Sequence, residues 1–228
     1  MATKDRHISP YSFSEKVKRM MWACVQVTLF RYSFHTWNGF RILLLNMFGA
    51  KIHRSCIVRR TVRIECPWNL TMGEHTCLGD CVIAYCLGEV TVGNRVSVSQ
   101  GVHLCAGTHD YTCETMPLLR LPVTIGDDAW IAADAFVGPG VTIGKGAILG
   151  ARGVAMKDLD ARTIYAGNPA KSIKARPTTD FAKESLFNLI SDARDEIDGL
   201  KAQIIARQNK LSSDTSKSNK AKMNYNVA

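Results

Sequence analysis

The chain has 228 residues, of which 46% are hydrophobic and 21% charged, with a formal net charge of +9 and eight cysteines. This length predicts one main domain with small flanking segments, and cysteines without any C-x-x-C pair are typical of free thiols in a reducing cytosol. The basic residues lie toward both ends without interleaved aromatic residues, which argues against nucleic-acid binding and favours a phosphorylated cofactor or an anionic membrane surface.

The first fifty residues predict a helical cap, residues 1–50. Ser12 and Glu15 have capping-box spacing, and apolar residues then recur at helical intervals as far as Leu29. A second helix is expected around residues 37–48. We expect these helices to cover the open first coil of the domain that follows.

A second interpretation of this segment is peripheral membrane association, given its mixture of aromatic and basic residues. The aliphatic run from Ile42 to Leu45 is too short to span a bilayer, and the sequence contains no recognisable secretory signal. A cytoplasmic protein is therefore expected.

A six-residue repeat dominates residues 51–176. It is clearest in two series, one aliphatic and one small, which are Ile125, Ile131, Val137, Ile143, Leu149 and Ala155, and Ala129, Ala135, Val141, Ala147 and Gly153. Such a repeat predicts a triangular coil in which both series point inward and stack at about 4.8 Å. The same frame continues upstream through Val92, Val98 and Leu104, with slips near Pro67 and Leu87 that we interpret as corner insertions.

One interruption stands out between Leu104 and Ile125. The six-residue frame is restored across this gap if Leu119–Val123 is a further hexad and residues 110–118 form a nine-residue loop that leaves the coil. Excursions of this kind commonly carry function. His109 lies at the mouth of the loop, where a histidine could take a proton from a hydroxyl and return it to a thiol. The alternative is a turn histidine, with Asp110 capping the loop.

Trp130 occupies the same hexad position as His109, so its ring should face outward, either on a binding surface or in a subunit contact. Lys157, Lys171 and Lys174 gather at the last coil, as a phosphate site or as a solvated charge run.

Beyond Pro177, apolar residues recur at alternating steps of four and three, which predicts a C-terminal helix over residues 177–211. This helix would pack on its own domain or self-associate. Residues 212–228 are expected to be a disordered tail. The seam consists of Leu186, Ile190, Ala193, Ile197, Leu200 and Ile204.

Four short runs join the hexads in pointing to a family: Gly-Thr-His-Asp-Tyr at 107–111, Asp-Ala-Trp-Ile at 128–131, Val-Gly-Pro-Gly-Val at 137–141 and Gly-Asn-Pro-Ala at 167–170. Together they closely resemble the hexapeptide-repeat acyltransferases, in particular the colanic-acid-biosynthesis type of O-acetyltransferase, related to galactoside and maltose acetyltransferases. The resemblance covers about residues 10–176. It implies an all-β fold, a left-handed parallel β-helix assembled as a homotrimer, with acetyl-CoA in the groove between adjacent subunits.

The resemblance also implies roles for individual residues. His109 would be the base that activates an acceptor hydroxyl for direct attack on the thioester, and Trp130 would line the acetyl and acceptor end. The expected cofactor contacts are Trp130, the backbone of Ala133 and Ala151 along the pantetheine arm, Met156 and Lys157 at the nucleotide end, and Lys171 and Lys174 near the phosphates. No metal is expected.

The acceptor is expected to be a saccharide hydroxyl in surface or exopolysaccharide biosynthesis. Asp80, Tyr85, Asp110 and Trp130 are the candidate acceptor contacts, with a structural corner role open for Asp80 and Tyr85. Relatives often carry an asparagine near residues 85–86, whereas Cys86 here is a poor donor and acceptor, so the acceptor's identity stays open.

Two other kinds of protein fit the same scaffold. One is a trimeric protein with a purely structural role and no catalytic activity, which we call the scaffold alternative. The other is a metal hydratase similar to the γ-class carbonic anhydrases, using His75, His103 and His109; their spacings of 28 and 6 do not match that family's closer final pair. A serine acetyltransferase fits less well, because it usually has a longer helical region ahead of the repeats.

Overall fold

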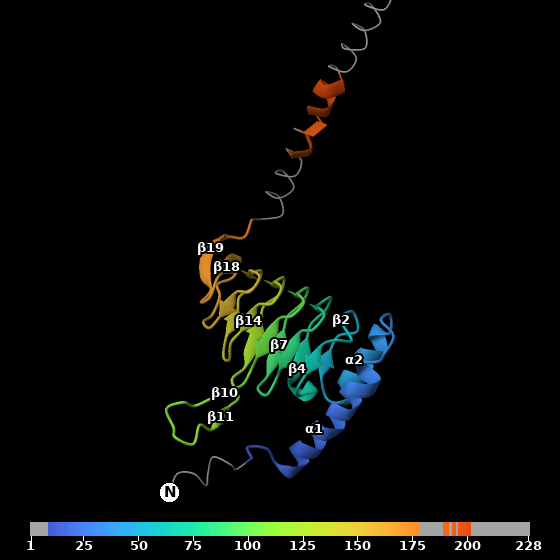
Figure 1. Cartoon of the computed structure of the whole chain (residues 1–228), viewed down its shortest axis with the longest axis vertical. Coiled ribbons are helices and arrows are strands. Elements are labelled where there is room, and N and C mark those ends of the chain that lie inside the picture. Colours follow the sequence, from blue (N-terminus) through green and yellow to red (C-terminus); the bar gives the residue numbers. More distant parts are fainter. Residues whose placement is uncertain (1–8, 178–188, 192, 195, 202–228) are drawn as a thin grey trace, which may run out of the picture. The chain divides into compact units, whose positions relative to one another are not determined.

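The computed structural model describes residues 9–177, 189–191, 193–194 and 196–201. The chain divides into two compact units, Met1–Arg176 and Pro177–Ala228. The first contains two helices followed by a stack of short strands (Figure 1).

Almost all strands of the first unit are two or three residues long, as short hexads with a corner after each side require. They are β1 (Lys51–Ile52), β2 (Ile57–Val58), β3 (Arg63–Ile64), β4 (Leu70–Met72), β5 (Cys77–Leu78), β6 (Ile83–Tyr85), β7 (Val90–Val92), β8 (Ser97–Val98), β9 (His103–Cys105), β10 (Thr108–His109), β11 (Leu118–Leu119), β12 (Val123–Ile125), β13 (Trp130–Ile131), β14 (Phe136–Val137), β15 (Thr142–Ile143), β16 (Ile148–Leu149), β17 (Val154–Ala155), β18 (Thr163–Ala166) and β19 (Lys171–Ala175).

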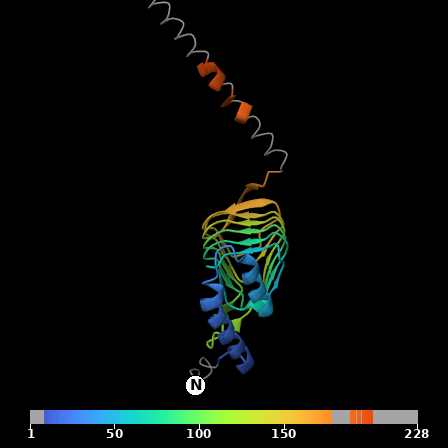
Figure 2. The ribbon, with the colours of Figure 1, turned by 90° about the vertical axis from the view of Figure 1, so that its right-hand side faces the viewer.

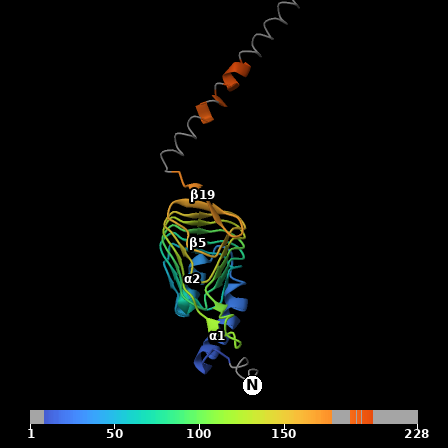
Figure 3. The same ribbon diagram turned by 90° about the vertical axis from the view of Figure 1, so that its left-hand side faces the viewer.

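Three sheets form the sides of a prism, and the chain visits them in turn. Sheet 1 has the order β1-β4-β7-β12-β15, sheet 2 the order β19-β18-β16-β13-β8-β5-β2, and sheet 3 the order β17-β14-β9-β6-β3. Neighbouring strands within the coil are parallel and come from successive turns, which Figures 2 and 3 show as stacked layers. The fold is the expected left-handed parallel β-helix.

The hexad residues form the core of this coil. Parallel pairing puts Ile131 between Val98 and Leu149, so identical repeat positions stack on one another. The aliphatic series from Ile125 to Ala155 is buried to 1% exposure or less, and the predicted inward positions are thereby confirmed. At the first slip the chain forms a short 3-10 turn, η3 (Pro67–Asn69), so the extra residues do sit at a corner.

The N-terminal helices are α1 (Phe13–Val25), continued by the π-helix η2 (Gln26–Phe30), and α2 (Asn38–Met47). The Ser12 hydroxyl accepts the Glu15 amide hydrogen bond at 3.2 Å, as the capping-box spacing predicts. Trp22 and Phe30 are buried against the first coil, and the Trp22 indole donates to the Ile64 carbonyl at 2.7 Å.

Three side-chain amides complete the cap, one for each edge strand of the first coil. Gln26 accepts from the amide of Ile64 in β3, and Asn38 accepts from the amide of Val58 in β2. Asn46 both donates to the carbonyl and accepts from the amide of Ile52 in β1, each at 3.0 Å. These bonds satisfy backbone groups that an open edge would leave unpaired, which is the covering role expected of the segment.

Several of the apolar residues that recur along the first helical segment are exposed rather than buried. Met20, Met21 and Leu29 are 54–61% exposed. The buried pair is Trp22 and Phe30, because their large rings fill the mouth of the solenoid and the indole also pairs with a backbone carbonyl.

The excursion from the coil is a β-hairpin rather than a simple loop. β10 pairs antiparallel with β11, with His109 opposite Leu118 and Thr108 opposite Leu119. Leu119 is 37% exposed, so the expectation of a further hexad from Leu119 is wrong, and the coil resumes at β12. The antiparallel ladder uses the backbone groups that a coil strand would offer its neighbours. We call residues 108–119 the His109 hairpin.

The last strand pair, β18 and β19, is antiparallel and ends sheet 2. In the second unit, the described residues between 189 and 201 are helical and include Ile190, Ala193, Ile197 and Leu200 of the predicted seam. Leu186, Ile204 and the predicted tail 212–228 lie outside the described residues. Among the residues described, no helix is long and apolar enough to cross a membrane.

Candidate active site

His109 is held in one orientation by the hairpin that carries it. Its Nδ1 lies 2.7 Å from the carbonyl oxygen of Met116, on the opposite arm of the hairpin. A carbonyl oxygen can only accept a hydrogen bond, so Nδ1 carries the ring proton and Nε2 keeps its lone pair. The side chain is exposed. The other ring nitrogen, Nε2, therefore faces away from this bond to the hairpin backbone.

Asp110 organises the turn of the hairpin. Its Oδ1 accepts from the amide and the hydroxyl of Thr112, at 2.9 and 2.6 Å, and its Oδ2 accepts from the Cys113 thiol at 3.4 Å. These hydrogen bonds, that from the Thr112 hydroxyl first, hold the pKa of Asp110 below its usual value. The carboxylate caps the loop, which favours the alternative reading of this residue over an acceptor contact.

The hairpin is tied to the start of the N-terminal cap. Arg120, which follows β11, donates to Glu15 in the first turn of α1 at 3.0 Å. The Arg120 guanidinium also lies 5.4 Å from the ring centre of Tyr11, and that of Arg19 lies 4.1 Å from the same ring. The cap thus fixes the hairpin as well as covering the core.

An aromatic column on sheet 3 leads to the base of the hairpin. Tyr85 packs edge-on against His103, with ring centres 6.2 Å apart, and His103 packs against Phe136 at 5.3 Å. Tyr85 also crowds Gly107, where any Cβ would lie 3.2 Å from the tyrosine ring. Tyr85 is therefore close enough to the His109 hairpin for the acceptor role expected of it.

The sequence suggests a role for His103 only as a metal ligand, whereas the structure shows a half-buried, neutral side chain. Its Nε2 is buried and has no hydrogen-bond partner among the described residues. Burial, with a smaller contribution from Arg63, lowers the pKa of His103, so the ring is neutral near pH 7. The sequence alone could not reveal this buried nitrogen without a described partner, because its burial depends on how the side chains pack.

Trp130 lies on sheet 2 with 45% of its surface exposed, and its indole donates to the Ser99 hydroxyl at 3.0 Å. Its outward orientation is as expected. The His109 hairpin, however, leaves the coil at the corner between sheets 3 and 1, after β9 and before β12. Sheet 2 is the opposite side of the prism, so one chain does not bring Trp130 and His109 together.

Most of the other predicted cofactor residues lie on the side of Trp130. Ala133 and Ala151 stack at the corner between sheets 2 and 3, where the Arg152 amide donates to the Ala133 carbonyl at 2.8 Å. Trp130 pairs with Ile148, Ile148 with Ile164 and Ile164 with Lys174, so Trp130 and Lys174 share one row of sheet 2, about 14 Å apart at strand spacing. Lys171 is in the same strand as Lys174.

Met156 and Lys157 lie elsewhere. Both are exposed and follow β17 of sheet 3, near the same corner as the His109 hairpin but on later turns of the coil. Asp80 is at a corner, where its Oδ1 accepts from the Thr61 hydroxyl at 2.6 Å and its Oδ2 lies 3.9 Å from Arg59. These bonds favour the structural role left open for Asp80.

The three histidines of the hydratase alternative are distributed over the solenoid. His75 is at a corner with a φ of 56°, His103 is on sheet 3 and His109 is in the hairpin. Among the described residues, no three His, Cys, Asp or Glu side chains are grouped so as to hold a metal ion.

The fold and the placement of His109 define a class: a hexapeptide-repeat solenoid with one oriented histidine on an excursion from the coil. Residues 122–154 match the family described as bacterial transferase hexapeptide (six repeats). The sequence is 41% identical to the Escherichia coli (strain K12) protein named "Putative colanic acid biosynthesis acetyltransferase WcaF" over 164 aligned residues. The alignment covers 72% of this chain and 90% of that protein. The chain therefore belongs to the hexapeptide-repeat acetyltransferases.

Solved structures agree with this fold. A maltose O-acetyltransferase from Clostridium difficile 630 matches with a TM-score of 0.64 and 24% identity, covering 71% of this chain and 88% of that one. A hexapeptide-repeat acetyltransferase from Vibrio cholerae O1 biovar eltor, complexed with acetyl coenzyme A, matches with a TM-score of 0.65 and 21% identity, covering 75% and 94%. At these identities the likeness concerns the fold.

Proposed function

We propose that this acetyltransferase uses acetyl-CoA to acetylate a saccharide hydroxyl, with His109 as the general base. The observation that carries the proposal is the bond from His109 Nδ1 to the Met116 carbonyl, which leaves Nε2 able to accept a proton. As Nε2 takes the hydroxyl proton, the acceptor oxygen bonds to the thioester carbon. The C–S bond then breaks, and the proton passes to the departing CoA thiolate.

The site is composed of two chains in a homotrimer. His109 and Trp130 lie on different sides of one solenoid, so a complete site needs the hairpin of one subunit against sheet 2 of the next. The exposed Trp130 ring then covers the thioester end of the cofactor, beside the His109 base of the neighbour. The hairpin of one subunit and sheet 2 of the next thus form the walls of a pocket that a single flat solenoid surface lacks.

The residues present fit acetyl-CoA. Lys157, Lys171 and Lys174 are exposed, and no ion pair joins any of them to an acid within the described part of the chain. Free ammonium groups suit the cofactor phosphates as point charges. Ala133 and Ala151 present small side chains and backbone at a corner, where the pantetheine arm could lie close. The Vibrio cholerae structure with acetyl coenzyme A has the same fold, which supports this cofactor.

The acceptor is a saccharide of surface or exopolysaccharide biosynthesis, by likeness to the colanic acid protein. Tyr85, at the base of the hairpin, is the favoured acceptor contact, and Asp80 and Asp110 are less favoured because their carboxylates already accept hydrogen bonds. All eight cysteines are free, and three of them are buried, which supports a reducing cytoplasm as the site of the reaction.

The test is release of CoA thiol from acetyl-CoA over a panel of sugars and nucleotide sugars. With an accepted sugar, His109→Ala should lower turnover by at least ~10²-fold, the usual scale for a general base, and should leave acetyl-CoA binding intact. His53→Ala, at an exposed position on the first coil, is the matched control and should keep turnover. Unchanged turnover in His109→Ala would refute the role of His109, and a folded trimer that binds no acetyl-CoA would favour the scaffold.

A further inference from the structure

The N-terminal segment exposes large apolar side chains after it has capped the solenoid. Six of them, between 54% and 82% exposed, are Val27, Leu29, Tyr32, Phe34, Trp37 and Leu43. They come from η2, from the connection to α2 and from α2 itself. So much exposed apolar surface in one short segment indicates a contact with another apolar phase or molecule.

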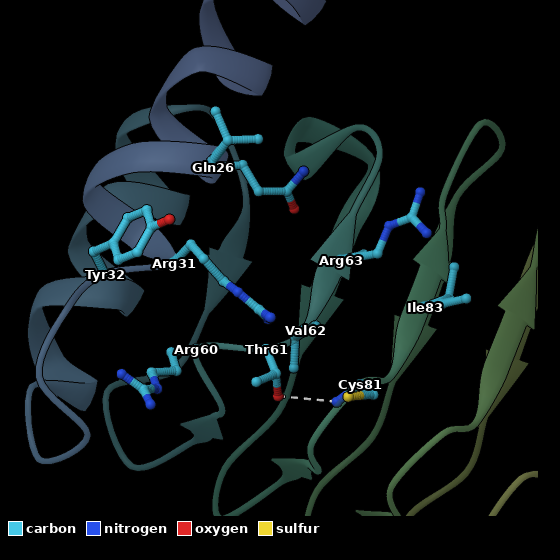
Figure 4. A pocket seen from close by; sticks show the side chains of 10 residues that line it. Gln26, Arg31, Tyr32, Arg60, Thr61, Val62, Arg63, Cys81 and Ile83 are labelled. Carbon is cyan, nitrogen blue, oxygen red and sulfur yellow. Dashed lines mark hydrogen bonds between the residues drawn. The ribbon is translucent and has the colours of Figure 1, made fainter.

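A basic pocket of about 550 Å³ lies beside this apolar segment. Val27 and Tyr32 belong to its lining and to the apolar segment, so the two features are continuous. Figure 4 shows the Arg31 side chain extending into the middle of the pocket, with Arg60 and Arg63 on opposite sides of it and their guanidinium ends directed outward. The pocket therefore has the Arg31 guanidinium in its middle, Arg60 and Arg63 at its rim, and apolar residues in its walls.

These arginines have no acidic partner in the part of the chain that the structure describes. No ion pair joins Arg31, Arg60 or Arg63 to an acid among the residues that the structure describes. The nearby Asp80 carboxylate accepts from Thr61 and lies 3.9 Å from Arg59 instead. Three like charges around one pocket repel one another, and a bound anion would relieve that repulsion.

A fourth arginine, close to Arg60, adds to the positive charge. Arg41 is buried and donates only to neutral oxygens, namely the Val58, Phe34 and His35 carbonyls and the Ser33 hydroxyl. Burial, and next the nearby Arg59 and Arg60, lower the pKa of Arg41, although a guanidinium stays charged at neutral pH. Its charge is thus uncompensated and contributes to a positive potential at this end of the protein.

We propose that this pocket binds the phosphate group of an anionic phospholipid, and that the surrounding apolar side chains enter the bilayer surface. Arginine matches phosphate geometry, and aromatic residues such as Tyr32 and Trp37 favour the interface between headgroups and acyl chains. An anion that carries an acyl chain satisfies both the guanidinium groups and the adjoining apolar surface, whereas a soluble phosphate satisfies only the first.

The lipid site is separate from the candidate active site. Glu15, at the start of α1, pairs with Arg120 beside the His109 hairpin, whereas Arg31 follows the far end of the same helical segment. Sixteen helical residues span roughly 24 Å. Lipid binding therefore does not depend on the proposed acetyl transfer, and either could fail alone.

The test is flotation of the full-length protein with vesicles. One set contains phosphatidylcholine with phosphatidylglycerol in equal parts, and the other contains phosphatidylcholine alone. The protein should bind the anionic set, and the triple variant Arg31→Gln/Arg60→Gln/Arg63→Gln should bind it ~10²-fold more weakly, since each arginine near an anionic surface contributes about fivefold. The matched control, Lys145→Gln/Arg152→Gln/Arg162→Gln, removes equal charge at the far coils and should weaken binding less than ~3-fold.

A second variant tests the apolar part. Tyr32→Ser/Trp37→Ser should weaken vesicle binding while leaving the oligomeric mass and the thermal unfolding of the protein unchanged. If the pocket triple variant and its matched control lost vesicle binding equally, the binding would depend only on net charge, and the proposal would be overturned. Release from anionic vesicles by millimolar inorganic phosphate would point to a soluble phosphate ligand instead. Dissociation of the oligomer by Tyr32→Ser/Trp37→Ser would mean that a second copy of the chain covers the apolar segment.

Discussion

The ring proton of His109 points from Nδ1 to the carbonyl oxygen of Met116, 2.7 Å away across the hairpin. The bond fixes which nitrogen can act as a base, and the hairpin that provides it is tied through Arg120 to Glu15 in the helical cap. Under the proposed function, the cap therefore contributes to catalysis by positioning the hairpin, in addition to covering the first coil of the solenoid.

A site shared between subunits predicts complementation. His109→Ala and Trp130→Ala should each be nearly inactive alone, because every site in such trimers lacks one of the two residues. Trimers re-formed from equal amounts of both variants should recover about a quarter of wild-type turnover, since one interface in four then joins an intact His109 to an intact Trp130. Thiol release after mixing and reassembly measures this. No recovery, with trimers verified by mass, would contradict the shared site.

The lysines of β19 and the last coil are expected to act on the cofactor phosphates. Lys171→Gln/Lys174→Gln should weaken acetyl-CoA binding, and Lys157→Gln should add to the loss. The penalty should be larger for CoA than for dephospho-CoA if these lysines meet the 3′-phosphate. Calorimetric titration with both ligands provides the comparison, and equal penalties would show that they do not.

Asn46 should be important for stability rather than for activity. Asn46→Ala removes both hydrogen bonds to the backbone of Ile52 and leaves an edge strand unpaired, at an expected cost of ~1–3 kcal/mol in the free energy of unfolding. Urea unfolding measures the change. Gln100→Ala, at a corner where no side-chain bond of Gln100 is seen, is the control, and equal losses in both would argue against the capping role.

Buried thiols predict weaker stability at alkaline pH. Burial raises the pKa of Cys86 to about 12 and that of Cys66 to about 11. In the unfolded chain both would ionise near pH ~8.5, so the unfolded state releases protons first and stability falls as pH rises from there toward ~11. By pH 10 the loss should be about 2 kcal/mol per thiol.

Urea unfolding at pH 8 and pH 10 under reducing conditions checks this. Cys66→Ala/Cys86→Ala should show a smaller fall than the wild type over that interval, whereas Cys24→Ala/Cys113→Ala, at two exposed cysteines, should keep the full fall. A fall that is the same in both double variants would assign the alkaline instability to other groups.

The coil could be predicted from the sequence because one physical requirement repeats every six residues. Ile131 and Leu149 must both be apolar, since they stack in the same core row. Leu119 was misplaced because its spacing of four from Val123 imitates two inward positions of a hexad, while the backbone pairing of β10 with β11 has no six-residue signature.

The features that were missed depend on contacts between distant residues. The bonds from Asn46 to Ile52 and from Gln26 to Ile64 join side chains to edge strands, and no periodicity encodes such pairs. The unpaired Nε2 of His103 and the cluster of Arg31 with Arg60 appear only once the coil and the cap are packed together. Residues on different turns of a solenoid become neighbours through the register of its strands.

Under the proposed function, acetyl-CoA binds at the interfaces of a trimer. Titration calorimetry of the purified protein with acetyl-CoA, with its mass in solution measured alongside, tests this most directly. We predict saturable binding with one site per chain in a trimer, and the same stoichiometry for His109→Ala. A folded protein that binds no acetyl-CoA, or a monomer that binds it fully, would contradict the claim.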